Sequence, residues 1–299
     1  MLLLLVCTLK VNAQQDPMYT QYMFNMLAIN PAYAGSRNVV SATALYRNQW
    51  SGLNGAPETT TFTIDAPFKD KKIGLGLQVF SDKLGITNTT GVVLSGSYRI
   101  RMDKGTLSFG LQGNVANRRA DFTQVSLDPN NSSNDLAFQD FVNQTNFNIG
   151  SGIYYNTDRF YIGLSSPQLL PVVYANSSGS NLSRQEIHLF LATGFVAKLS
   201  EDFKLKPSVL VKAVEGAPVQ ADINATFWIK DRFGIGAQYR TNADVSAFLE
   251  LQLSQQIRLG YAYDYAVTNL QSINSGSHEL MLRYEFGFEK DKFISPRFF

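Results

Sequence analysis

Apolar side chains recur at every second position in many successive segments of this chain. In one segment near the C-terminus, the apolar set is Ile257, Leu259, Tyr261, Tyr263 and Tyr265, and the set between them is Arg258, Gly260, Ala262 and Asp264. Side chains alternate between the two faces of a strand, so each such segment predicts a β-strand with one apolar face. The segments are about ten residues long, which is the length of a tilted strand that crosses a bilayer. A soluble sandwich shares the alternation, but the strand length favours a membrane.

Turn residues divide the pattern into about fourteen predicted strands. We expect these strands at residues 38–48, 58–66, 72–80, 86–102, 106–116, 145–156, 159–165, 185–199, 202–213, 218–230, 232–240, 244–253, 256–266 and 278–288. The fold class indicated is therefore all-β.

The connections between these strands alternate in length. The short ones are residues 69–71, 103–105, 157–158, 200–201, 231 and 254–255, and the long ones are 49–57, 81–85, 117–144, 166–184, 214–217 and 267–277, with 241–243 as a short exception. Short turns at one end and long loops at the other are typical of outer-membrane barrels. A sheet in lipid must also close, because open edges would leave backbone groups unpaired. We therefore predict a transmembrane antiparallel β-barrel, with both ends of the strand array on the short-turn, periplasmic side.

Composition agrees with this fold and excludes other classes of protein. The chain of 299 residues has 21 Phe, 14 Tyr and 22 Gly, but only 17% charged residues. Strand formers are thus abundant, and the charge that stabilises exposed helices is scarce. The net charge of +2 and the absence of Lys/Arg runs argue against nucleic acid as a partner.

The first thirteen residues read as a signal peptide for export. Leu2 to Val6 form a short apolar core, and small residues end at Ala13. No basic residue precedes the core, so the natural start is expected to lie further upstream. A lipoprotein anchored at Cys7 is the alternative, although Val6 stands where a small residue is needed. Cys7 is the only cysteine, so the mature chain is expected to have no disulfide and no thiol chemistry.

The charged residues of the polar faces suggest ion pairs inside a barrel. The acidic set is Asp222, Glu250, Asp264, Glu279 and Glu285, and the basic set is Lys204, Lys206, Lys212, Arg240, Arg258 and Arg283. The same polar faces carry Asn224, Lys230, Gln238 and Gln252. Mixed charge in a lumen forms a ladder of ion pairs, which is either structural or tunes a channel. A catalytic carboxylate pair is the alternative that we do not favour.

Neither histidine lies in a convincing catalytic pattern. His188 shares the polar face with Glu186, which is a dyad or, as we prefer, a hydrogen-bonded pair in the lumen. His278 follows Ser277, but Ser-His hydrolysis needs an orienting residue and an oxyanion hole, and neither is visible. Two histidines without a mature cysteine also predict no transition-metal site. We therefore expect no catalytic residue, no metal and no cofactor.

Gly-x-Gly fragments occur at Gly74, Gly150 and Gly234. No helix follows any of them, so a phosphate-binding loop is excluded. They are interpreted instead as points of close packing on the inner face of strands.

Two N-terminal segments have the most distinctive sequence in the chain. They are QQDPMYTQYMFNMLAINPAYAGS (14–36) and YRNQWSGLNGAPETTTFTIDAPF (46–68). The distinctive pieces are Asp16-Pro17, Gln21-Tyr22, Asn30-Pro31-Ala32-Tyr33-Ala34-Gly35, Arg47-Asn48-Gln49-Trp50 and the closing Ser295-Pro296-Arg297-Phe298-Phe299. Together they resemble the PorP/SprF family of Bacteroidota outer-membrane proteins, which is associated with type IX secretion and gliding motility.

The blocks outside the strands predict the remaining organisation. Residues 1–13 are the signal peptide, 14–37 a periplasmic N-terminal segment or a plug, 38–288 the barrel and 289–299 a periplasmic tail. Methionines and Phe24 give residues 19–27 an adaptable apolar surface, which either packs into the lumen or meets a partner. The aromatic C-terminus either serves recognition by the assembly machinery or reaches toward the secretion apparatus. The partner-binding candidates are Gln21, Tyr22, Asn30, Pro31, Tyr33, Gly35, Trp50, Arg297, Phe298 and Phe299.

The resemblance implies a non-enzymatic accessory barrel of the cell outer membrane, surrounded by outer-membrane lipid. It would support secretion or cell-surface attachment of a partner such as an adhesin, and would contact the periplasmic lipoprotein ring of the secretion system. The alternative is a porin or a hydrophobic-solute channel. A third reading, a lipid hydrolase using His188 or His278, finds no support beyond the two histidines.

Overall fold

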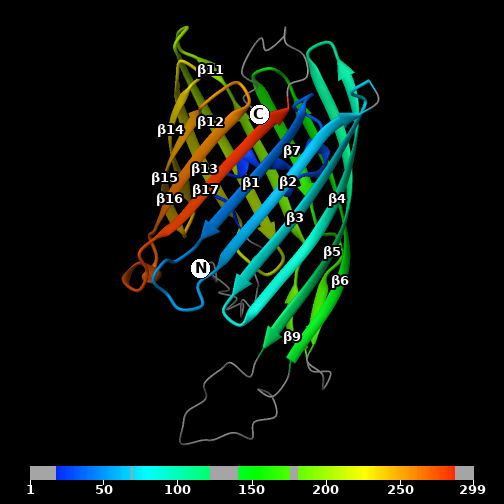
Figure 1. Ribbon diagram of the computed structural model, residues 1–299, viewed down its shortest axis with the longest axis vertical. Helices are drawn as coiled ribbons and strands as arrows, with labels where there is room; N and C mark the ends of the chain where they lie inside the picture. The colour runs from blue at the N-terminus through cyan, green and yellow to red at the C-terminus, as the bar shows by residue number, and fades with distance from the viewer. Residues whose placement is uncertain (1–17, 69, 122–140, 176–180, 287–299) are drawn as a thin grey trace, which may run out of the picture.

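The computed structural model describes residues 18–68, 70–121, 141–175 and 181–286. Within these ranges the chain forms one closed antiparallel β-barrel of fourteen strands, each paired with its neighbours in sequence order. The barrel closes where β1 (Val40–Asn48) pairs with β17 (Ser277–Phe286), from Val40 opposite Phe286 to Asn48 opposite His278. Figure 1 shows this seam, with β1 in blue beside β17 in orange-red. The predicted fold class is confirmed.

All fourteen predicted strands are present. The others are β2 (Glu58–Phe68), β3 (Ile73–Leu84), β4 (Thr87–Met102), β5 (Gly105–Asp121), β6 (Phe141–Asn156), β7 (Phe160–Ser166), β10 (His188–Phe195) with β11 (Ala197–Lys198), β12 (Phe203–Val214), β13 (Gln220–Ile229), β14 (Phe233–Arg240), β15 (Asp244–Gln252) and β16 (Ile257–Ala266). β10 and β11 both pair with β12, so they count as one interrupted strand. A short 3₁₀ turn, η6 (Asn269–Ser272), lies in the connection from β16 to β17.

The strands β3, β5 and β6 are longer than predicted, and all three extend at the long-loop end, which is the lower end in Figure 1. Residues 81–84, 117–121 and 141–144 of the predicted loops are therefore strand. The run Asn117–Arg119 shows why the pattern missed this extension, because all three residues are polar. Strand that leaves the bilayer has water on both faces, so apolar alternation no longer marks it.

A small hairpin occupies the predicted loop 166–184. It consists of β8 (Val172–Ala175) and β9 (Asn181–Gln185), which pair only with each other among the described residues.

The outer surface of the barrel is apolar and the inner surface is polar. Leu94 and Leu111 are 64% and 71% exposed, whereas their neighbours Ser95 and Gln112 point inward and are buried. So large an apolar surface belongs in lipid. No helix in the described ranges is long and apolar enough to span a membrane.

One inward expectation is wrong. Lys230 lies in the β13–β14 turn, exposed, where Lys230 and Asp231 have φ of 50° and 54°. Positive φ at both central residues suits the two-residue hairpin turn that fits strand twist. Lys204 and Gln252 keep the inward side of their strands but lie at strand ends and are half-buried, and Lys204 Nζ is 2.7 Å from Asp231.

Candidate functional site

The lumen of the barrel is filled by the segment that precedes β1. Residues 18–37, called the plug here, contain three single 3₁₀ turns, η1 (Tyr22–Phe24), η2 (Met26–Ala28) and η3 (Pro31–Tyr33). Asn30 caps the last turn, because its side-chain oxygen accepts a hydrogen bond from the Ala32 amide at 2.9 Å and Pro31 occupies the first position. The short turns let the plug change direction repeatedly within a narrow space.

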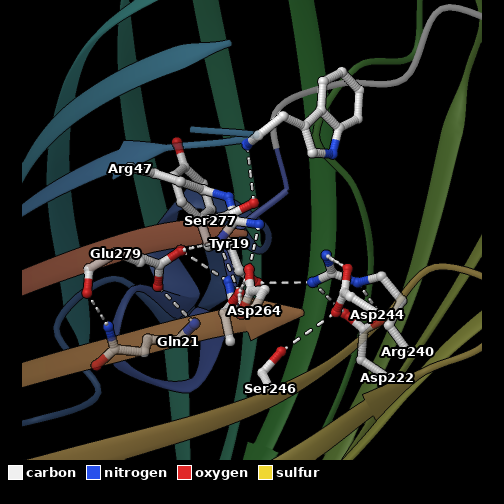
Figure 2. A network of polar contacts seen from close by, with 12 residues as sticks. Tyr19, Gln21, Arg47, Asp222, Arg240, Asp244, Ser246, Asp264, Ser277 and Glu279 are labelled. Carbon is white, nitrogen blue, oxygen red and sulfur yellow. Dashed lines mark hydrogen bonds and ion pairs between the residues drawn. The ribbon is translucent and has the colours of Figure 1, made fainter. Parts of the chain in front are cut away.

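The plug is fastened at the long-loop end by a buried carboxylate. Glu279 on β17 accepts hydrogen bonds from the backbone amides of Thr20 at 2.9 Å and Gln21 at 2.7 Å. Arg47 on β1 donates to the same carboxylate at 3.0 Å and to Asp264 on β16 at 2.6 Å. Figure 2 shows Tyr19 and Gln21 of the plug beside Arg47, Asp264 and Glu279. We call this cluster the latch.

The Thr20 hydroxyl completes the latch. It donates to Asp264 at 2.7 Å and accepts from Arg47 at 2.7 Å. Arg47, Asp264 and Glu279 are almost completely buried, so each charge depends on its partners rather than on water.

A second ion-pair cluster lies beside the latch (Figure 2). Asp222 pairs with Lys212 at 2.8 Å and with Arg240 at 2.9 Å, and all three are buried. Arg240 also pairs with Asp244 at 3.2 Å and donates to the backbone oxygen of Tyr19 at 3.4 Å. The predicted mixed-charge ladder therefore exists, and in this region it holds the plug.

Aromatic side chains of the plug contact polar groups in the middle of the lumen. The Tyr22 hydroxyl is bonded to Ser208 at 3.3 Å and to Asn224 at 3.0 Å, and burial raises its pKa. Three cations of the barrel wall surround the Phe24 ring at 5.7–5.8 Å from its centre; they are Lys206, Arg258 and Arg283. A ring face attracts cations, so Phe24 partly offsets the burial of three like charges.

At the short-turn end the plug backbone lies directly on glycines. A Cβ at Gly110 would stand 2.2 Å from the Ala32 amide nitrogen, and one at Gly74 would stand 1.9 Å from the Ala34 carbonyl oxygen. Only glycine admits so close an approach. The close-packing interpretation of the Gly-x-Gly fragment at Gly74 thus agrees with the structure, and the packing partner is the plug.

The end of the plug is bonded to the barrel before β1 begins. The Gly35 amide donates to Asp65 at 2.8 Å, and Arg37 pairs with Glu285 at 2.5 Å. The plug therefore runs from the long-loop end of the lumen, at Tyr19, to the short-turn end, at Arg37.

Most partner-binding candidates lie inside this plug. Gln21, Tyr22, Asn30, Pro31 and Tyr33 are buried. Gly35, with φ of 70°, is enclosed against Ala66 and Gly74. In this conformation all six anchor the plug, and contact with a partner stays a prediction for them.

The remaining candidates lie elsewhere. Trp50 is half-buried in the β1–β2 loop, and its amide donates to Ser277 at 3.1 Å. Arg297, Phe298 and Phe299 lie outside the described residues.

The two histidines are in structural positions. His188 is buried, and its Nδ1 lies 3.0 Å from the carbonyl oxygen of Glu186. His278 is 2.8 Å from the Tyr261 hydroxyl. In the described part of the chain no cluster of His, Cys, Asp and Glu could hold a metal ion.

The latch was not found from the sequence. Glu279 and Thr20 lie 259 positions apart, and no motif connects a carboxylate on the last strand to an amide before the first. Arg47 belongs to the distinctive Arg47-Asn48-Gln49-Trp50 piece, but that piece predicts no ion pair.

Sequence comparison decides the family. The profile of the family described as "Type IX secretion system membrane protein PorP/SprF" matches residues 11–284. The chain belongs to this family. It is accordingly an outer-membrane β-barrel of the PorP/SprF type, in a family of membrane proteins rather than enzymes, as the resemblance implied.

Solved structures of other outer-membrane proteins are similar at low identity. Omp33 of Acinetobacter baumannii is 9% identical, with 83% of this chain and 96% of that chain covered and a TM-score of 0.46. The CymD monoaromatic hydrocarbon channel is 11% identical, with 90% and 93% covered and a TM-score of 0.47. The KdgM porin is 12% identical, with 83% and 100% covered and a TM-score of 0.41. No curated protein matches the chain.

Proposed function

We propose that this barrel supports secretion or cell-surface attachment of a partner protein, such as an adhesin, by binding it rather than by conducting solutes. The observation that carries the proposal is the plug. A conducting porin needs a continuous aqueous path, whereas here residues 18–37 occupy the lumen along its length and are bonded to its wall at both ends.

The long-loop end offers the surface for such a partner. With this end outward, the ends of β3, β4, β5 and β6 reach further from the membrane than those of β1, β16 and β17 (Figure 1). Apolar side chains are exposed in the connections at this end; they are Leu169, Leu170, Val219 and Ile273. Exposed apolar groups outside the bilayer mark sites of protein contact. The short-turn end would face the periplasmic lipoprotein ring of the secretion system.

Co-purification tests the proposal. The barrel, extracted from outer membranes in mild detergent, is expected to carry a secreted protein that is lost when Leu169 and Leu170 are both changed to Ser. The matched control changes lipid-facing Leu280 and Leu282 to Ser, which alters two exposed leucines without touching the loops.

Planar-bilayer recording of the same protein distinguishes the alternative, a porin or hydrophobic-solute channel. We expect no steady conductance from the intact barrel. A stable, solute-selective pore in protein that carries no partner would refute the binding function.

A further inference from the structure

A cavity of about 180 Å³ remains between the plug and the inner wall of β3 to β6. Tyr19, Tyr22 and Ile29 of the plug form one side of it. Its lining extends to Leu84 and Thr87 at the tip of the β3–β4 hairpin, so the cavity lies in the long-loop half of the lumen.

The strand register places several amide side chains side by side in this wall. Gln78, Val93, Asn114 and Asn148 are cross-strand neighbours on β3, β4, β5 and β6, and all four are buried and line the cavity. Gln112 lies two residues along β5 and faces the same space. The wall is therefore a row of carboxamides around one valine.

Atoms of four amides in the lining have no hydrogen-bond partner among the residues that the structure describes. They are Gln112 Oε1, Asn114 Oδ1, Gln168 Oε1 and Asn146 Nδ2. The orientation of two of these amides is fixed by their other atom, because Gln112 Nε2 donates to the Pro167 carbonyl at 2.9 Å and Asn146 Oδ1 accepts from Gln144 at 3.0 Å. Gln112 and Asn114 are only 8% and 7% exposed. Buried polar atoms without a partner are costly, so the cavity is built for a ligand that supplies both donors and acceptors.

The charged side chains of the lining argue against an ionic ligand. The two charged side chains of the lining are already engaged, since Arg118 stacks over the Tyr174 ring at 4.2 Å and Asp82 accepts the Thr59 hydroxyl at 2.6 Å. The groups left to bind a ligand are neutral amides and the ring of Phe80.

A peptide is also a poor fit for this wall. Peptides are recognised chiefly through backbone hydrogen bonds to a free strand edge. Across β3, β4, β5 and β6 the backbone groups are used in continuous ladders, so this wall presents side chains alone, and the β8–β9 hairpin adds Val172, Tyr174 and Gln185 to the lining. A ligand with many hydroxyls and apolar C–H faces satisfies both the amides and the ring. The cavity holds about a dozen water-sized volumes, which matches one sugar unit.

We propose that this cavity binds a neutral saccharide unit, held by Gln112, Asn114 and Asn146 and packed against an aromatic ring. This site is independent of the protein partner, so either can fail without the other.

Isothermal titration of the full-length barrel in detergent tests the proposal with neutral sugars in two arms. One arm uses free maltose, chitobiose and lactose, and the other uses vesicles that carry a glycolipid with the same sugars. Binding in the first arm identifies a soluble or protein-borne glycan, and binding in the second arm alone identifies a lipid-borne one. Both support the proposal provided that Gln112→Leu weakens binding at least tenfold.

Asn114→Ala is the second variant, and it keeps the test valid if Gln112→Leu does not fold. Gln238→Leu is the matched control, because Gln238 is another buried amide with unpartnered atoms that lies outside the cavity lining. It is expected to leave affinity unchanged. The proposal is overturned by absence of binding in both arms, by affinity that Gln112→Leu and Asn114→Ala leave intact, or by a glycine-rich peptide that binds the cavity more tightly than any sugar.

Discussion

The latch predicts that one neutralising substitution will loosen the plug. Glu279→Gln keeps the size of the side chain but replaces one carboxylate oxygen with the NH₂ group of a carboxamide. The new amide can still accept from one plug amide, yet its NH₂ group must then face either the other plug amide or Arg47, which are donors at 2.7–3.0 Å.

The size of the effect on the plug follows from the hydrogen bonds and the ion pair that are lost. Hydrogen bonds to charged groups contribute about 1.5–3 kcal/mol each, and breaking a buried ion pair costs about 3–5 kcal/mol. Taking about 2.8 kcal/mol as a conservative figure for the difference between plugged and unplugged states, the unplugged population rises about 100-fold.

Single-channel recording measures this change directly. Wild-type barrel should show rare, brief openings, and Glu279→Gln should raise the open probability by about two orders of magnitude. Glu250→Gln is the matched control, because Glu250 is equally buried in the lumen but its carboxylate oxygens accept no hydrogen bond from the plug. Equal open probability in wild type and Glu279→Gln, or an equal rise in both variants, would refute the latch.

Three further predictions concern the plug seat, the lumen and the lipid face. Gly110→Ala places a methyl group 2.2 Å from the plug backbone, so it should increase the open probability of the channel. Gly96→Ala, with nothing within 4 Å of the added Cβ, should not. An unchanged open probability in Gly110→Ala would contradict the packing of the plug on Gly110. Asp222→Asn removes the buried counter-charge of Lys212 and Arg240, so it should lower the free energy of unfolding by about 3 kcal/mol. Urea titration followed by gel mobility measures this change. Glu201→Gln, in an exposed pair with Lys198, should leave the midpoint of urea unfolding unchanged. Leu94→Arg, in the middle of β4 on the lipid face, should cost about 2–4 kcal/mol in vesicles, and Leu84→Arg, at the end of β3, about 1 kcal/mol or less; equal costs would argue against the assigned membrane position.

The barrel itself could be predicted because its signal is local. The alternation from Ile257 to Tyr265 marks a strand without any knowledge of its neighbours, and the turn at Lys230 and Asp231 separates two strands by itself. Alternation missed strand where water lies on both faces, as in Asn117–Arg119.

The candidate site could not be predicted in the same way because its signal is non-local. The Asn30-Pro31 turn predicted a break, and the methionines predicted an adaptable surface, but both fitted a plug or a partner-binding segment. The choice depends on Glu279, Asp264 and Arg47 converging on Thr20, and these residues come from the opposite ends of the chain.

The location of the latch has a consequence for biogenesis. The carboxylates that hold the plug lie on β16 and β17, and β17 also closes the barrel against β1. Thr20 and Gln21 therefore have no carboxylate to bind until the last strands are made. A chain that closed its seam with residues 18–37 outside would seal a wall through which twenty residues could not return sideways. The two strands that complete the ring therefore also supply the last carboxylates that hold the plug.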